Sequence, residues 1–196
     1  IFLFDNSSWQ PVFQFDLHTD YKNIEKHLDG VKGVDFLGVR NETPYFFEVK
    51  NFKDHWIENK ERLGNLGECL MTEVAQKVKD SLACIIAGKR NSTNDKKLWK
   101  RFLDLLNDEN NPIKVVLWLE MDDRTVNLDE RRAKIKRRRN ITRLADYQKK
   151  LQSKLKWLIP TRANIMILNI ANYSNSIDFV VERAGGTDNP LSSGFK

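Results

Sequence analysis

Two stretches of sequence decide the fold: GVDFLG at residues 33–38 and YFFEVK at residues 45–50. Both are mainly apolar, and the short polar segment 41–44, which ends in proline, separates them. Two apolar runs joined by a short polar loop are typical of a β-hairpin. We therefore expect adjacent strands at residues 34–39 and 45–49.

Three charged residues interrupt this hairpin: Asp35 in the first run, and Glu48 and Lys50 in the second. Side chains alternate between the two faces of a strand, so Phe46, Glu48 and Lys50 share one face. The hairpin can place Asp35 beside them. Burying such charges is costly unless they pair or bind an ion. Two readings follow: a divalent-cation site with an attendant lysine, or an ion pair at the strand ends.

This constellation resembles the PD-(D/E)XK nuclease superfamily, whose members share the restriction-endonuclease-like fold. In that family an aspartate in one strand precedes an acidic-x-Lys motif that ends the next strand, and here these are Asp35 and Glu48-Val49-Lys50. The resemblance covers residues 21–87. It implies that Asp35, Glu48 and the Val49 carbonyl bind Mg²⁺, for which Mn²⁺ can substitute. It also implies that Lys50 positions the attacking water.

The resemblance extends to the helices on either side of the hairpin. Many members carry a glutamate on the preceding helix, and Glu25 matches it as a catalytic residue and as a metal ligand, through water or to a second ion. The following helix often adds a polar residue, for which Gln76 or Glu73 is the candidate. One departure is Gly33-Val34, where the family often has proline before the aspartate.

The rest of the chain reads as alternating helices and strands. Helical spacing of apolar residues predicts three further helices, and apolar runs predict three or four further strands. An α/β restriction-endonuclease-like sandwich follows, with a central mixed β-sheet flanked by helices. We expect one nuclease-like domain over residues 1–196, with a basic helical insertion at 122–160. The expected helices are 21–28, 68–82 and 93–106, and the other expected strands are 83–87, 113–121, 165–170 and 177–181.

Composition excludes several classes of protein. The chain has 196 residues, of which 40% are hydrophobic, with 11 Phe and 5 Trp, so wholesale disorder is not expected. Its apolar stretches are far shorter than the roughly 18 residues of a membrane span. Two cysteines form no disulfide framework. We therefore expect a cytoplasmic protein without a membrane partner.

The net charge of +6 hides a strong asymmetry. Residues 131–156 contain 12 bases and one acid. Such a segment indicates a polyanion partner, and we expect nucleic-acid contacts there. A solvated helix face, a disordered basic loop and an acidic protein partner are the alternatives. The expected contact residues are Arg131, Arg132, Lys136, Arg137, Arg138 and Arg139.

The sequence thus predicts a metal-dependent nuclease that hydrolyses phosphodiester bonds, with DNA favoured over RNA. Restriction or anti-phage defence is the setting associated with the fold, and a homodimer or larger complex is compatible with it. Two alternatives remain: a non-catalytic nucleic-acid-binding module on the same fold, and a structural subunit that binds an acidic partner.

Overall fold

The structure is a computed structural model that describes residues 2–5, 7–52, 67–121, 129–173 and 179–181. Its centre is a five-stranded mixed sheet in the order β2-β3-β4-β5-β6. The first three strands of this order pair antiparallel, and β4, β5 and β6 pair parallel. These strands are β2 (Trp9–Gln14), β3 (Phe36–Arg40), β4 (Thr43–Asn51), β5 (Lys114–Glu120) and β6 (Ile165–Leu168).

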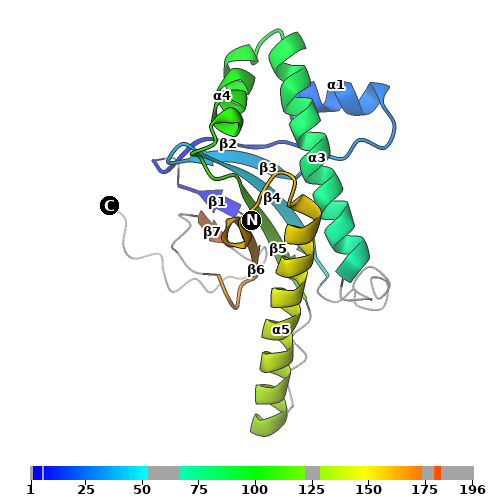
Figure 1. The fold of residues 1–196 in the computed structure, drawn as a ribbon, viewed down its shortest axis with the longest axis vertical. Coiled ribbons are helices and arrows are strands. Elements are labelled where there is room, and N and C mark those ends of the chain that lie inside the picture. Colours follow the sequence, from blue (N-terminus) through cyan, green and yellow to red (C-terminus); the bar gives the residue numbers. More distant parts are fainter. Residues whose placement is uncertain (1, 6, 53–66, 122–128, 174–178, 182–196) are drawn as a thin grey trace, which may run out of the picture.

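Helices cover one face of the sheet, and a small second sheet covers the other (Figure 1). Side chains from all four helices join one large apolar core with the sheet face they cover. These helices are α1 (Thr19–His27), α3 (Glu68–Asn91), α4 (Lys96–Asn107) and α5 (Glu130–Leu155). On the opposite face, β1 (Phe2–Phe4) and β7 (Phe179–Val181) pair antiparallel over a cluster rich in aromatic rings. The expected α/β architecture with a central mixed sheet is confirmed.

One expected strand is wrong: residues 83–87 continue α3 instead of leaving it. The apolar run there has helical spacing, because Cys84, Ile85 and Gly88 are buried while Ala83 and Ile86 are exposed. A Cβ on Gly88 would lie 2.6 Å from the ring of Trp99 on α4, so glycine allows the two helices to approach closely. Packing against α4 therefore decides in favour of helix.

Two elements at the N-terminus were not expected. β1 and β2 lie before the hairpin, and β2 pairs with β3 as the edge strand of the main sheet. Proline at position 11 and the mixed polarity of WQPVFQ conceal β2 in the sequence. The remaining predicted helices and strands appear, most of them with shifted ends. Of the last predicted strand, residues 179–181 are described and form β7, whereas residues 177–178 and the start of the predicted basic insertion, 122–128, lie outside the described part of the chain.

The basic segment forms helix α5, whose two halves have different surroundings. Tyr147, Leu151 and Leu155 in its second half are buried in the core, so this half is attached to the body of the protein. The first half carries exposed side chains and projects beyond the body (Figure 1). None of the helices in the described part of the chain combines the length and apolar character that a bilayer crossing demands.

Candidate functional site

The loop that precedes Asp35 is held against α1 and α3. A Cβ at Gly33 would lie 2.7 Å from the ring of Tyr21, so this backbone approaches α1 more closely than other residues permit. The backbone N–H groups of three successive residues donate to side chains of these helices: Lys32 to Asp80 at 3.2 Å, Gly33 to Tyr21 at 2.9 Å and Val34 to Ser81 at 3.0 Å. These contacts fix the position of Asp35 at the start of β3.

Asp35 itself is joined to the strands on both sides. Its backbone N–H donates to the carbonyl of Phe47 on β4 at 2.9 Å, and its carbonyl accepts from Phe15 at 2.8 Å. Its carboxylate Oδ2 accepts a 2.6 Å hydrogen bond from the backbone N–H of Val49. The Asp35 side chain therefore lies at the end of β4 that bears Glu48 and Lys50.

Glu48 and Lys50 point toward the helical face of the sheet, as strand alternation predicts. The Glu48 side chain is 1% exposed, and its Oε1 lies 2.8 Å from the Lys50 ammonium. Two residues of α3 complete the cluster. Lys77 Nζ lies 2.7 and 2.8 Å from the two Glu48 oxygens and 3.4 Å from Asp35 Oδ1, while Glu73 Oε1 lies 3.0 Å from Lys50 Nζ.

The electrostatics of this cluster favour added positive charge. Burial, followed by the negative charge of Asp35, raises the pKa of the Glu48 carboxyl despite its two lysine partners. Burial alone would lower the pKa of Lys50, but Glu48 and Glu73 outweigh it and the net shift is upward. Among the described side chains around Glu48 and Lys50, negative charge therefore exceeds positive charge.

A further carboxylate, which the sequence did not single out, lies beside this cluster. Asp16 follows β2, and with Asp35 it lines an open cleft of about 460 Å³. Its Oδ1 is buried and has no hydrogen-bond partner. Burial and then the charge of Asp35 raise the pKa of the Asp16 carboxyl, against a hydrogen bond from Gln14. No periodicity or motif marks Asp16, because β2 is itself concealed in the sequence.

The donor set fits a hard divalent cation. Mg²⁺ prefers oxygen ligands and is commonly held by one or two carboxylates while it keeps several waters. Asp35 and Glu48 supply such carboxylates, and Glu48 Oε1 accepts no well-directed hydrogen bond although two ammonium groups lie near it. Three carboxylates contact two lysines in this cluster, so the ionised cluster carries one excess negative charge. Its members are Asp35, Glu48, Glu73, Lys50 and Lys77, and Asp16 lies beside them.

The structure does not bring Glu25 into contact with this cluster. Its carboxylate accepts hydrogen bonds from Lys22 at 2.7 Å and from the Tyr21 hydroxyl at 3.2 Å. The hydrogen bond from Lys22 is the main cause that lowers the pKa of Glu25. Through Tyr21, Glu25 instead supports the loop at Gly33.

Of the two candidates on α3, Glu73 reaches the cluster and Gln76 does not. The Gln76 amide donates to Asp80 one turn later, and Gln76 is exposed. The spacing of apolar residues on α3 explains why Gln76 does not reach the cluster. Each residue turns a helix by about 100°, so Gln76, two positions from both Val74 and Val78, points away from the buried stripe. Glu73 and Lys77 lie one position before those residues and flank the stripe.

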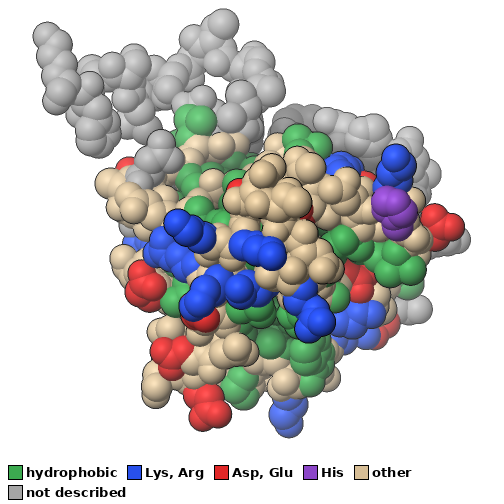
Figure 2. Space-filling model, turned by 90° about the horizontal axis from the view of Figure 1, so that it is seen from above, with side chains coloured by type: hydrophobic (Ala, Val, Ile, Leu, Met, Phe, Trp, Pro, Cys, Tyr) green, Lys and Arg blue, Asp and Glu red, His purple; other side chains and the backbone are tan. Residues whose placement is uncertain are grey.

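The predicted nucleic-acid contact residues all lie on the first half of α5. Arg131, Arg132, Arg138 and Arg139 are exposed, whereas the side chains of residues 136 and 137 lie outside the described part of the structure. A second group of basic side chains lies where α3 meets α4, near the middle of the face in Figure 2. The exposed bases at the end of α3 and along α4 are Arg90, Lys96, Lys97, Lys100 and Arg101.

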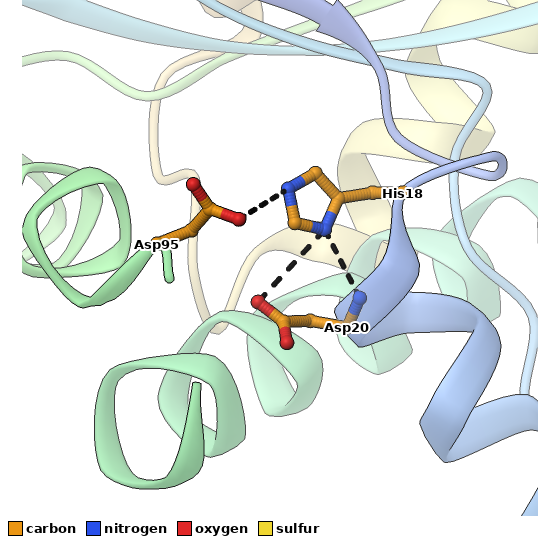
Figure 3. Close-up of side chains that lie close together, drawn as sticks. All are labelled: His18, Asp20 and Asp95. Atoms are coloured by element: carbon orange, nitrogen blue, oxygen red, sulfur yellow. Dashed lines mark hydrogen bonds and ion pairs between the residues drawn. The ribbon is translucent and has the colours of Figure 1, made fainter. Parts of the chain in front are cut away.

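Three potential metal ligands meet elsewhere, at His18, Asp20 and Asp95 (Figure 3). The contacts of these three residues join α1 to α4, so a structural role accounts for them. His18 Nδ1 accepts from the backbone N–H of Asp20 and so caps α1, while His18 Nε2 lies 3.5 Å from Asp95. Asp20 accepts a 2.6 Å hydrogen bond from the indole N–H of Trp99.

The geometry of the candidate site therefore rests on the hairpin and α3. Comparison of the chain with protein-family models, with curated proteins and with solved structures finds no match.

Proposed function

We propose that this protein is a metal-dependent nuclease of the restriction-endonuclease-like fold. The observation that supports this best is the meeting of Asp35, Glu48 and Lys50 beside α3, with Glu48 almost wholly buried. The order of elements supports the same family. After α1 come the β3–β4 hairpin, then the two helices α3 and α4, and then β5, which pairs parallel with β4.

In this function, Asp35, Glu48 and the carbonyl of Val49 hold Mg²⁺, with Mn²⁺ as a substitute. A divalent ion bound there lowers the pKa of its water and stabilises negative charge on the scissile phosphate. Lys50 holds the attacking water and balances the charge that develops on the phosphate. Glu73 accepts from Lys50 and so keeps its ammonium in place beside Glu48.

The first half of α5 holds the nucleic-acid backbone in this proposal. Its exposed arginines carry dense positive charge on an arm that projects from the body. Such contacts read phosphates and not bases, so they supply affinity without sequence specificity. DNA is the favoured substrate, and restriction or anti-phage defence is the setting that we propose from the fold alone.

Cleavage of plasmid and single-stranded DNA with Mg²⁺ or Mn²⁺ tests this function. Lys50→Ala is expected to reduce cleavage by about a hundredfold or more, because its interaction matters most in the transition state. Duplex binding, measured in Ca²⁺, should stay within a few-fold of wild type. The control is Lys79→Ala, an exposed lysine of α3 that pairs only with Asp80 among the contacts described. If Lys50→Ala cleaved DNA at the wild-type rate, the assignment of the hairpin as the active site would be wrong.

A second function has one observation in its favour. The Lys77 ammonium lies between Asp35 and Glu48, and a lysine there can neutralise the acids without any metal. A non-catalytic nucleic-acid-binding module on this fold would show salt-dependent DNA binding. It would show no cleavage with either metal, and no response of its thermal midpoint to Mn²⁺.

A further inference from the structure

Lys77 has an unusual position for a side chain that comes from a helix surface. It lies on α3, yet its ammonium reaches across to the sheet and contacts three oxygens of two carboxylates. The Nζ atom lies 2.7 and 2.8 Å from the Glu48 oxygens and 3.4 Å from Asp35 Oδ1. Only 14% of the side chain is exposed. It therefore occupies the space between the two acids that the proposed function assigns to a divalent cation.

Lys77 and a divalent ion cannot both occupy this place. Mg²⁺ binds oxygen at about 2.0–2.1 Å and keeps its octahedral shell, which leaves no room for an ammonium among the same oxygens. Metal binding at Asp35 and Glu48 therefore requires Lys77 to leave.

Lys50 is in a different situation. It contacts one oxygen of Glu48, and Glu73 gives it a second carboxylate partner outside the space between Asp35 and Glu48. It can stay in place when a metal binds. When Lys77 is displaced, Asp16 can accept a hydrogen bond from its ammonium. The charges of Asp16 and Lys77 interact, and the buried Oδ1 of Asp16 has no hydrogen-bond partner.

We propose that Lys77 is an internal competitor of the metal: its ammonium occupies the divalent-cation position in the metal-free protein and must be displaced when the metal binds. This inference rests on the proposed nuclease function and adds a form of regulation to the same site.

Calorimetric titration of the full chain with Mn²⁺ tests the competition. Lys77→Met removes the charge and keeps an unbranched side chain, so Mn²⁺ should bind about tenfold tighter than to wild type. Lys79→Met, two residues further along α3, is the matched control and should bind Mn²⁺ within twofold of wild type. Lys77→Arg keeps the positive charge, so its affinity for Mn²⁺ should also remain close to that of wild type.

A second measurement uses the wild-type protein and does not depend on how Lys77→Met folds. The ammonium resonances of Lys50 and Lys77, observed by nitrogen-15 NMR and assigned with Lys77→Arg, respond differently to Mg²⁺ in our proposal. The Lys77 resonance should shift strongly or exchange away, and the Lys50 resonance should persist. An undisturbed Lys77 resonance at saturating Mg²⁺ would overturn the displacement.

The outcomes separate this inference from the proposed function. Wild-type protein that binds Mn²⁺ and cleaves DNA, with equal or weaker Mn²⁺ binding by Lys77→Met, would refute the competition and leave the nuclease intact. Absence of Mn²⁺ binding by wild type and by all three variants would overturn both.

Discussion

Glu48 and Glu68 are both paired with two lysines, but their surroundings move their pKa values in opposite directions. Glu48 on β4 lies between Lys50 and Lys77, and its pKa is raised. Glu68 at the start of α3 accepts hydrogen bonds from Lys150 and Lys154 of α5, and these lower its pKa to about 2.

Burial explains the difference. Glu48 is 1% exposed and has a second carboxylate, Asp35, nearby, whereas the Glu68 side chain is 46% exposed. Loss of hydration raises the pKa of an acid, and a nearby acid adds to that effect. Two lysines are thus sufficient for the exposed Glu68, which joins α3 to α5. They are insufficient for Glu48, and its site retains a demand for positive charge.

The largest expected difference is between Glu48→Gln and Glu68→Gln, in their cleavage rates and in their stabilisation by Mn²⁺. Glu48→Gln should reduce metal-dependent cleavage by about a hundredfold or more. It should also abolish the stabilisation by Mn²⁺, which for wild type at one hundred times the dissociation constant is about 2.7 kcal/mol. Cleavage rates and thermal midpoints, with and without Mn²⁺, provide the measurement.

Glu68→Gln is the control for that exchange, and it should keep both cleavage and the response to Mn²⁺. Equal losses in the two variants would mean that the contrast between the glutamates has no bearing on chemistry. The comparison would also fail if wild type did not respond to Mn²⁺ or Mg²⁺ at all.

The second expected effect concerns the half of α5 that lies beyond the Glu68 contacts. Replacing Arg131, Arg132, Arg138 and Arg139 with Gln should weaken duplex binding and its salt dependence. The slope of log affinity against log salt should fall by about 0.9 for each phosphate that is no longer neutralised, so by up to about 3.6. The thermal midpoint should barely change, since all four side chains are exposed.

The basic group on α4 supplies a matched control with the same change of charge. Lys96, Lys97, Lys100 and Arg101, all exposed, are replaced with Gln in the same assay. Their salt slope should stay at the wild-type value. A lower slope in this variant alone would move the nucleic-acid surface to the face seen in Figure 2.

The smallest expected effect is the pH dependence of the Glu68 contacts. The folded pKa of Glu68, about 2, lies below its ordinary value of 4.5, so the contacts stabilise the fold fully above pH 4.5. This stabilisation is lost as the pH falls from 4.5 to about 2. Glu68→Gln should lower the thermal midpoint at pH 7 by about 2 °C or less.

The check is thermal melting of wild type and Glu68→Gln across that range of pH. The difference between the two proteins should shrink steadily as the solution becomes more acidic than the ordinary pKa of a glutamate. A constant difference would show that charge does not hold α5 to α3.

The candidate site divides into residues that the sequence identified and residues that it missed. Asp35, Glu48 and Lys50 come from one hairpin, where strand alternation and a short turn decide which side chains meet. Lys77 and Asp16 reach the site from elements that are distant in the sequence or concealed in it. The bare motif therefore identified the acids and one lysine but not the second cation between them.

Some elements of the fold follow from the local sequence pattern, and others depend on tertiary packing. The sequence by itself determined the hairpin, the buried strand β5 and the basic helix, because hydrophobic period and turn chemistry act over neighbouring residues. Only the tertiary structure decided that residues 83–87 remain helical, where Trp99 packs over Gly88. The spacing of apolar residues on α3 turns Gln76 away from the buried stripe, but only the tertiary structure decided that Glu73 and Lys77 reach Lys50 and Glu48 and that Glu25 does not. The rotation of a helix about its axis depends on what its buried face packs against, and that partner lies far away in the chain.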